Sequence, residues 1–247
     1  GHTPSEAAKP HIVELDGKEI GIYCCAGHEF SIVGKQKGGA NPFDPLDSLD
    51  HIMNIKAQCD YVICLYHGGK EHYRYPSPNL QKTCRKIVEK GADLVVCQHT
   101  HCIGCEEKWQ GGTIVYGQGN FLFDHSESEF WQTSVLVSVN VAEKQIEYVP
   151  IQKKGKGIKL AVGESASKIL AEMQHRSEEI IQDGFIEKRY DAFAMQMREL
   201  YLKTGDYIAT SFVFRVINKI SGHKLMPWYI NKKLKKNRQF LINFIEC

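Results

Sequence analysis

Residues 60–71 read Asp-Tyr-Val-Ile-Cys-Leu-Tyr-His-Gly-Gly-Lys-Glu, and residues 91–101 read Gly-Ala-Asp-Leu-Val-Val-Cys-Gln-His-Thr-His. Each stretch contains a continuous apolar run of strand length that ends in histidine. Between them, residues 78–90 carry apolar side chains at helical spacing, with a proline at the start and Gly91 after the end. A strand, a helix and a second strand joined by short connections predict parallel pairing of 60–66 with 93–97.

The alternation of strands and helices extends outward from this segment. Upstream, we expect a strand at 18–24 with 12–15 as its hairpin partner, a loop at 31–45 and a helix at 46–57. Downstream, the expected strands are 113–116, 120–123, 134–141 and 145–151. Further on the apolar spacing becomes helical, and the expected helices are 165–183, 186–203, 207–220 and 229–244. The sequence therefore predicts an α/β domain at 1–152, a linker at 153–163 and a helical region at 164–247.

Composition sets the broad class of protein. The chain has 247 residues, of which 43% are hydrophobic and 24% are charged. These fractions are typical of a globular protein and exclude a disordered, collagen-like or coiled-coil chain. No apolar run reaches the ~18 residues that a membrane-spanning helix needs, and no signal peptide is visible.

Charge is spread unevenly along the chain. The net charge of +2 divides into −4 over residues 1–155 and +6 over residues 156–247. Lysines 232, 233, 235 and 236 and Arg238 gather in the last expected helix. A basic amphipathic helix of this kind either docks on its own domain with a solvated basic face or binds anionic lipid or an acidic polymer.

Nine cysteines are present, at positions 24, 25, 59, 64, 84, 97, 102, 105 and 247. Several lie inside apolar strand-like runs, whereas a disulfide framework would place them in loops. We interpret most of them as reduced, buried small hydrophobes. A disulfide between Cys102 and Cys105 is the alternative.

The histidines are the strongest candidates for chemistry. His67 and the His99–His101 pair follow two apolar strands that we expect to be neighbours, and ligands collect beyond the carboxyl ends of such strands. Imidazole is a good ligand for Zn, Mn or Fe. Glu71 lies four residues after His67, close enough to orient a ligand or to act as an acid or base. The alternative is that these are polar loop histidines and Glu71 is a solvated charge.

A third element, residues 114–124, contains two glycines that interrupt a strand pattern. Glycine there indicates a bulge or a close approach of the backbone. Gly119 and Asn120 are the candidate substrate-binding residues, although a buried Asn120 is also explained by a structural hydrogen bond.

The absence of their motifs argues against several common site types. Cys102-Ile-Gly-Cys105 has no second C-x-x-C to complete a zinc finger, and it does not open a helix as a thioredoxin-like redox pair would. The P-loop, the dinucleotide-binding fingerprint and the nucleophile elbow do not occur in the chain.

Taken together, the blocks from His67 to Asp124 resemble the CapA-type poly-γ-glutamate capsule-synthesis proteins, which are related to the calcineurin-like metallophosphoesterases. That family's pattern is approximately H-W-G-x-E-Y, then G-A-D-x-V-x-G-x-H-P-H, then Y-S-L-G-N-F-x-F-D. Order and spacing match here, although Gly68, His72, Cys97 and Thr100 depart from the pattern. The resemblance implies a mixed-sheet α/β fold with an αββα sandwich, and it does not cover the helical region.

The resemblance also implies a metal site, and it indicates which part of a family member this chain matches. His67, His99 and His101 would belong to a two-metal site, but the D-x-H, G-D-x-x-D and G-N-H-D motifs that supply the other ligands are absent from this chain. The chain is therefore similar to the C-terminal portion of such a protein and is expected to hold at most one divalent ion, as in an open three-histidine site.

The predicted function is capsule or polyglutamate-type polymer biosynthesis with a phosphoesterase-like, metal-dependent hydrolase site. Its expected partners are an anionic polymer or phosphoester, membrane proteins of capsule synthesis, and an anionic membrane surface through Lys232–Arg238; no nucleic acid is expected. The resemblance implies a location in the cell envelope. The alternative function is a non-catalytic protein that binds an anionic polymer or a membrane surface.

Overall fold

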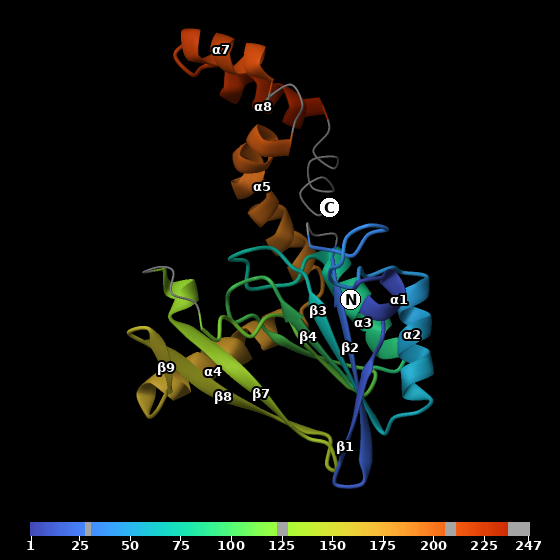
Figure 1. Ribbon diagram of the computed structural model, residues 1–247. Helices are drawn as coiled ribbons and strands as arrows, with labels where there is room; N and C mark the ends of the chain where they lie inside the picture. The colour runs from blue at the N-terminus through green and yellow to red at the C-terminus, as the bar shows by residue number, and fades with distance from the viewer. Residues whose placement is uncertain (28–30, 123–127, 206–210, 237–247) are drawn as a thin grey trace. The chain divides into compact units, whose positions relative to one another are not determined.

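The computed structural model describes residues 1–27, 31–122, 128–205 and 211–236. The chain forms two compact units, Gly1–Phe185 and the part from Ile186 onward. Figure 1 shows the first unit as a pair of sheets with flanking helices and the second as a set of helices.

The first unit is built on a six-stranded mixed sheet with the order β1-β2-β3-β4-β6-β5. The strands β2, β3, β4 and β6 are parallel, whereas β1 and β5 pair antiparallel at the two edges. The pairing of β3 with β4 confirms the parallel arrangement predicted from residues 60–66 and 93–97. The strands are β1 (His11–Leu15), β2 (Lys18–Ala26), β3 (Tyr61–His67), β4 (Leu94–Gln98), β5 (Glu106–Trp109) and β6 (Gly112–Val115).

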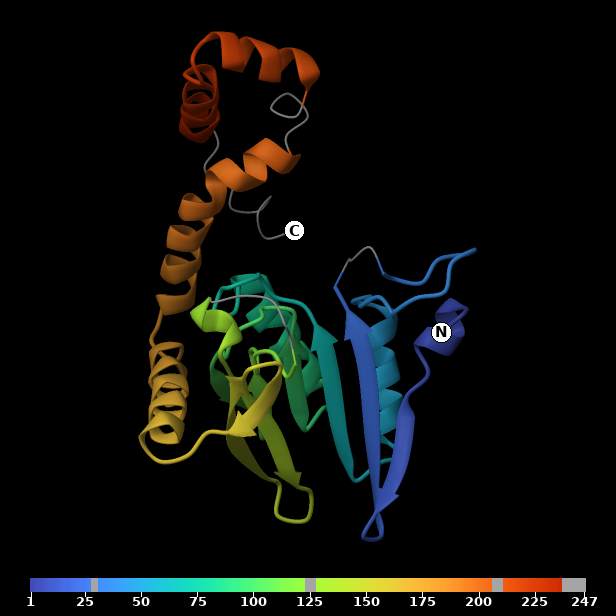
Figure 2. The ribbon, with the colours of Figure 1, turned by 60° about the vertical axis from the view of Figure 1, so that its left-hand side comes forward.

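A second sheet and three longer helices complete the layers. The antiparallel sheet contains β7 (Thr133–Asn140), β8 (Gln145–Lys154) and β9 (Gly157–Leu160), and the helices are α2 (Asp47–Lys56), α3 (Pro78–Glu89) and α4 (Glu164–Glu179). Figure 2 shows α2 on one side of the six-stranded sheet, with the second sheet and α4 on the other. A core that includes Leu94, Val115, Val135 and Met173 fills the space between the sheets and α4. This α/β/β/α order agrees with the predicted fold class.

Local sequence signals explain the two helices that cover the outer sheet face. The Ser77 hydroxyl accepts a hydrogen bond from the Leu80 N–H at 3.1 Å, and Pro78 occupies the first turn of α3. Helix α2 approaches β2 closely at Gly21, where a Cβ atom would lie 2.3 Å from a methyl group of Ile55. Short elements add to these: α1 (Pro4–Ala7) begins the chain, and the 3₁₀ helix η1 (Glu129–Trp131) precedes β7.

The structure differs from the sequence-based prediction after residue 100. The predicted strand at 120–123 is wrong over 120–122, which lie outside the named strands, and β5 and β9 were not predicted. The predicted linker at 153–163 contains the β8–β9 hairpin, because Gly155 adopts a φ of 57° and turns the chain back. A glycine- and lysine-rich segment of this kind fits a hairpin turn as well as a linker.

The compact first unit also extends beyond the predicted boundary at 152. Helix α4 buries Ile169 and Met173 against the core. The Arg176 side chain donates to the Gly104 carbonyl at 2.9 Å, and the Glu106 N–H donates to the Ser177 hydroxyl at 2.8 Å. These contacts make α4 part of the α/β unit rather than of a separate helical region.

The second unit is helical, as predicted. It contains α5 (Phe185–Gly205), which begins at the unit boundary, α7 (Phe212–Ile220) and α8 (Leu225–Lys236). The predicted helix at 207–220 is confirmed from Phe212 onward, and residues 207–210 lie outside the described part. The helix predicted at 229–244 begins earlier, at Leu225, and its last residues, together with Arg238, also lie outside the described residues. Within the described ranges, no helix has the length and apolar composition needed to cross a bilayer.

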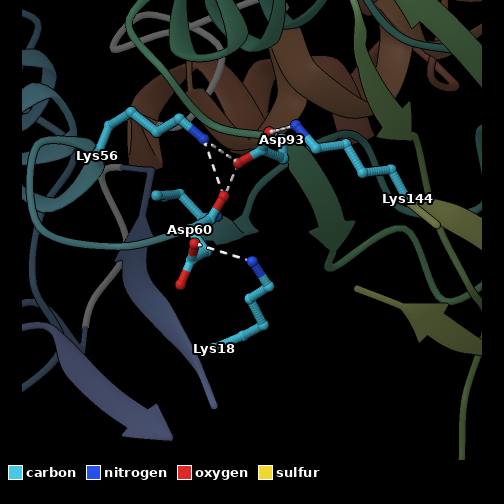
Figure 3. A network of polar contacts seen from close by, with 6 residues as sticks. Lys18, Lys56, Asp60, Asp93 and Lys144 are labelled. Atoms are coloured by element: carbon cyan, nitrogen blue, oxygen red, sulfur yellow. Dashed lines mark hydrogen bonds and ion pairs between the residues drawn. The ribbon is translucent and has the colours of Figure 1, made fainter. Parts of the chain in front are cut away.

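A polar network lies at the end of the sheet where β3 and β4 begin (Figure 3). Asp93 accepts from the Val62 N–H at 2.9 Å and forms ion pairs with Lys56 at 2.7 Å and Lys144 at 3.2 Å. Its carboxylate thereby ties together α2, β3 and the turn between β7 and β8. Because the strands are parallel, this network lies at the end of the sheet opposite to the one where β3 and β4 deliver their histidines.

The prediction for the cysteines is confirmed for the eight that the structure describes. All eight are free, and all except Cys24 are buried. Cys102 and Cys105 are therefore thiols in this structure, and burial raises the pKa of both. The Sγ atoms of Cys84 and Cys97 lie 3.5 Å apart between α3 and β4.

Candidate functional site

His67 and His99 meet at the carboxyl end of two central strands. His67 ends β3 and is paired in register with Gln98, the last residue of β4, so that His99 follows immediately beside it. The Nε2 atom of His67 lies 3.2 Å from the Nδ1 atom of His99, and the ring centroids are 5.0 Å apart. Two side chains separated by 32 positions in the chain are thus brought together by the parallel pairing.

Backbone hydrogen bonds fasten the loops after β3 and β4 to each other. The Gly68 N–H donates to the Gln98 carbonyl at 2.9 Å, and the His72 N–H donates to the Thr100 carbonyl at 2.8 Å. The Gly27 N–H, after β2, donates to the His67 carbonyl at 2.8 Å. The ends of three parallel strands therefore form one connected framework under the imidazoles.

The histidine loops adopt backbone conformations that L-residues rarely take. The φ angles are 58° at His72, 99° at His99 and 57° at His101. Residues held in such regions cost of order 1–3 kcal/mol each and cluster at functional sites, where the surrounding structure enforces them. Three histidines with positive φ in two adjoining loops therefore mark this end of the sheet as a candidate site.

Asn120 orients His101. Its side-chain Nδ2 donates to the His101 carbonyl at 3.3 Å, which turns its Oδ1 toward the His101 ring, 2.8 Å from Nδ1. An amide oxygen is only an acceptor, so this contact requires the proton of His101 on Nδ1. The structure thus gives Asn120 the structural hydrogen bond considered in the sequence analysis, and its predicted contact with substrate stays a prediction.

A group of aromatic rings packs beside His101. Trp131 stacks on the His101 ring at 4.8 Å, and His72 stacks on Phe130 at 5.1 Å. The Arg74 guanidinium lies 4.7 Å above the Phe130 ring. These rings were not predicted as site residues, because residues 129–131 carry no motif or periodic pattern that points to the histidines.

Two glycines let the 114–120 segment pass close to the histidine loop. Gly117 has a φ of 133°, and a Cβ atom there would lie 2.6 Å from the Thr100 hydroxyl and 2.8 Å from the Cys102 carbonyl oxygen. Gly119 pairs with Ser134 and has a φ of 81°. Gly119 therefore serves as a point of close backbone approach in the structure, and its role in binding substrate stays a prediction.

Glu71 is exposed in the loop after β3. Within the described ranges, no hydrogen bond or ion pair joins its carboxylate to a histidine of the site. The structure thus brings His67 and His99 together, places His101 next to them with ring centroids 6.1 Å from His99, and leaves Glu71 in solvent. Asp124, the last residue of the third motif, lies outside the described residues.

The two facing nitrogens fit one metal ion. Two imidazole nitrogens that bind the same tetrahedral ion at ~2.0–2.1 Å lie about 3.3–3.4 Å apart, close to the 3.2 Å between His67 and His99. No group of three or more His, Cys, Asp or Glu side chains among the described residues is arranged to hold a metal ion. The described side chains therefore supply two ligand positions, with His101 alongside.

Removing the Asn120 side chain is expected to change which ring nitrogen of His101 carries the proton. In Asn120→Ala the Nδ1–H loses its acceptor, so the ring should populate both neutral tautomers. The affinity for an ion held by His67 and His99 should change by less than about threefold, because His101 lies beside this pair and not in it. Ring-nitrogen NMR shifts of His101 and metal titration measure the two effects.

Two control variants separate orientation from folding. Asn120→Asp keeps an acceptor oxygen and should retain the Nδ1–H tautomer, and Asn54→Ala removes an exposed amide from α2 and should change neither quantity. A single unchanged tautomer in Asn120→Ala would show that another group orients the ring.

Comparison with known proteins gives a consistent assignment over the first half of the chain. Residues 1–125 match the family described as bacterial capsule synthesis protein PGA_cap. The chain is 32% identical over 90 residues to the PGA biosynthesis protein CapA of Bacillus subtilis strain 168, and 31% identical over 98 residues to the capsule biosynthesis protein CapA of Bacillus anthracis. These alignments cover 36% and 38% of this chain and 24% of each relative, so the chain matches about a quarter of the curated relatives' length.

Two solved structures overlap the chain in part. A phosphatase from Mycoplasma pneumoniae has a TM-score of 0.38 at 15% identity, with 58% of this chain and 57% of that chain covered. A hypothetical protein from Thermus thermophilus has a TM-score of 0.35 at 13% identity, with 63% and 62% covered.

Proposed function

Because the chain belongs to the bacterial capsule synthesis protein family PGA_cap, we propose that it carries the divalent-metal site of a hydrolase-like protein in capsule-polymer synthesis. The single observation that carries this proposal is the 3.2 Å approach of the His67 and His99 ring nitrogens. The proposed ion is Mn, Zn or Fe, which imidazole ligands suit. The proposed location is the cell envelope, in keeping with capsule synthesis.

The roles of the side chains follow from their geometry. His67 and His99 would hold the ion, and His101 would lie at the same end of the sheet, where it could contact a second ion or the substrate. A bound divalent ion lowers the pKa of coordinated water and polarises an ester or amide oxygen. Trp131 keeps the His101 ring in place by stacking, and Asn120 keeps its proton on Nδ1.

The substrate class that suits this site is an anionic polymer or a phosphoester. The β8–β9 hairpin places Lys153 and Lys156 around a small cavity that Asn120 and Trp131 also line. Positive charge beside a site of this kind favours carboxylate- or phosphate-bearing ligands. Other capsule-synthesis proteins at the membrane are its proposed partners.

A binding role without catalysis is the second candidate. It is favoured by one observation, namely that the 3.2 Å between the ring nitrogens of His67 and His99 is also a hydrogen-bond distance. In this alternative the two imidazoles share a hydrogen bond, one as donor and one as acceptor, and the site holds an anionic polymer without cleaving it.

Titration of the chelator-treated protein with Zn²⁺ and Mn²⁺ distinguishes the two candidates. We expect about one ion per chain by calorimetry. Affinity should fall at acidic pH, because ligand imidazoles must be neutral and protons compete with the ion. A polymer-binding protein without metal would show no heat with either ion, and that result would contradict the metal proposal.

A further inference from the structure

Helix α7 carries an apolar face that nothing described in its own unit covers. Five large hydrophobic residues of this nine-residue helix are 40–81% exposed: Phe212, Val213, Val216, Ile217 and Ile220. At 100° per residue they span one continuous side of the helix. Monomeric soluble proteins scatter exposed apolar side chains singly, so a contiguous group of this kind indicates an interaction surface.

The neighbouring helix α8 packs against a different side of α7. Phe214 contacts Tyr229 with ring centroids 5.1 Å apart, and the Asn218 Oδ1 accepts from the Met226 N–H at 2.8 Å. Phe214 and Asn218 are the half-buried residues of α7, and they lie one turn apart on the side away from the five apolar residues. Helix α8 therefore orders α7 and leaves its apolar face open.

The charge around this face has one sign. Between Phe212 and Lys236 the chain has seven lysine or arginine residues and no aspartate or glutamate. Arg215 and Lys219 are exposed on α7 itself, next to the apolar side, and Lys224 is exposed in the turn that follows. On α8, Lys232 is exposed and its ammonium lies 4.8 Å above the ring of Trp228.

We propose that α7 binds the surface of an anionic lipid bilayer, with Phe212, Val213, Val216, Ile217 and Ile220 inserted at the boundary between headgroups and acyl chains. Helices that lie in the membrane interface combine an apolar face with a basic polar face. Nine residues are too few to span a bilayer, so α7 lies in the plane of the interface.

The positive charge around α7 favours an anionic membrane over a second copy of the chain as the partner of its apolar face. A second copy of the chain would bring another set of seven cations against the first, which repel each other. An anionic membrane instead attracts each basic residue near its surface. The membrane contact predicted through Lys232–Arg238 stays a prediction, and the contact proposed here lies on α7, with Arg215 and Lys219 beside the apolar face. This inference does not depend on the metal site.

Co-sedimentation of the full chain with vesicles tests the proposal. We expect binding to vesicles that mix phosphatidylglycerol with phosphatidylcholine, and at least roughly tenfold weaker binding to pure phosphatidylcholine. Binding should also weaken as salt rises, because salt screens the basic residues. Absence of binding to the anionic vesicles would overturn the proposal.

Paired variants then locate the contact. The double variant Val213→Ser and Ile217→Ser should lower anionic-vesicle affinity by roughly tenfold or more, because it removes apolar surface from the inserted face. Arg215→Gln with Lys219→Gln should lower it and flatten the salt dependence. The matched control Ile181→Ser alters a side chain that is 76% exposed in the first unit and should bind as the unchanged chain does.

Circular dichroism and analytical ultracentrifugation complete the test. All variants should keep the helical signal of the unchanged chain, since the replaced residues are exposed. Equal vesicle binding by the Val213→Ser, Ile217→Ser variant would overturn the assignment to α7. A concentration-dependent dimer that this same variant abolishes would place a second copy on the face and would also overturn it.

Discussion

Replacing His99 with alanine is expected to lower the affinity of the chain for Zn²⁺ or Mn²⁺ by about 100-fold or more. The variant removes one of the two facing nitrogens, and removal of a ligand should cost at least as much as removal of its hydrogen-bonding partner. Calorimetric titration measures the affinity, and elemental mass spectrometry of the purified protein measures retained metal. Any hydrolysis of phosphoesters that the protein shows with added metal should disappear with the ion.

Three further variants test whether the metal ion is bound by the His67–His99 pair. His67→Ala should cause a similar loss, and the double variant should lose little more than either single one, because the two nitrogens hold one ion. His175→Ala removes an imidazole that is 72% exposed on α4 and pairs with Glu179 at 3.7 Å, so the variant should bind metal normally. Metal binding that survives both His67→Ala and His99→Ala would place the ion elsewhere.

Replacing Gly117 with alanine is expected to destabilise the protein by about 2–4 kcal/mol. The φ of 133° is unfavourable for any residue with a Cβ atom. The new methyl group would also lie 2.8 Å from the Cys102 carbonyl oxygen, a backbone atom that cannot rotate away. Because the Thr100 hydroxyl is displaced by the same methyl group, the His99–His101 loop should shift and metal affinity should fall as well.

Urea unfolding followed by far-UV circular dichroism measures the loss of stability. The control is Gly34→Ala, since a Cβ atom at Gly34 would meet nothing within 4 Å. This variant should change the free energy of unfolding by no more than about 0.5 kcal/mol. If Gly117→Ala is as stable as Gly34→Ala, the backbone of the histidine loop accommodates a side chain and the site is less rigid than its contacts indicate.

The central part of the fold could be predicted from the sequence because its signals are strong and local. Continuous apolar runs before His67 and His99, separated by a capped helix, determine a parallel strand pair. The same pattern placed both histidines at one end of the sheet, and the structure brings their rings into contact. The edges of the fold were harder to predict: β5 is the polar segment Glu106–Trp109, and β9 is four residues long after a glycine turn.

The surroundings of the site could not be predicted because they depend on contacts distant in sequence. Trp131 stacks on His101 across 30 positions, and Asn120 reaches the same ring from the loop after β6. Neither contact is associated with a periodic pattern in the sequence. The expected strand at 120–123 failed for a related reason: the apolar residues Phe121 and Leu122 are exposed, and burial is what an apolar strand pattern assumes.

Because Cys24 is exposed and its neighbour Cys25 is buried, the rate of thiol labelling can report the opening of the sheet. Cys24 is exposed, whereas Cys25 and the six other cysteines that the structure describes are buried. A thiol-reactive dye added to the native protein should therefore modify Cys24 first among these eight. The others react only as fast as the strands separate from their helices, so the slow phase of labelling reports the rate of local or global unfolding at the framework that carries the histidines.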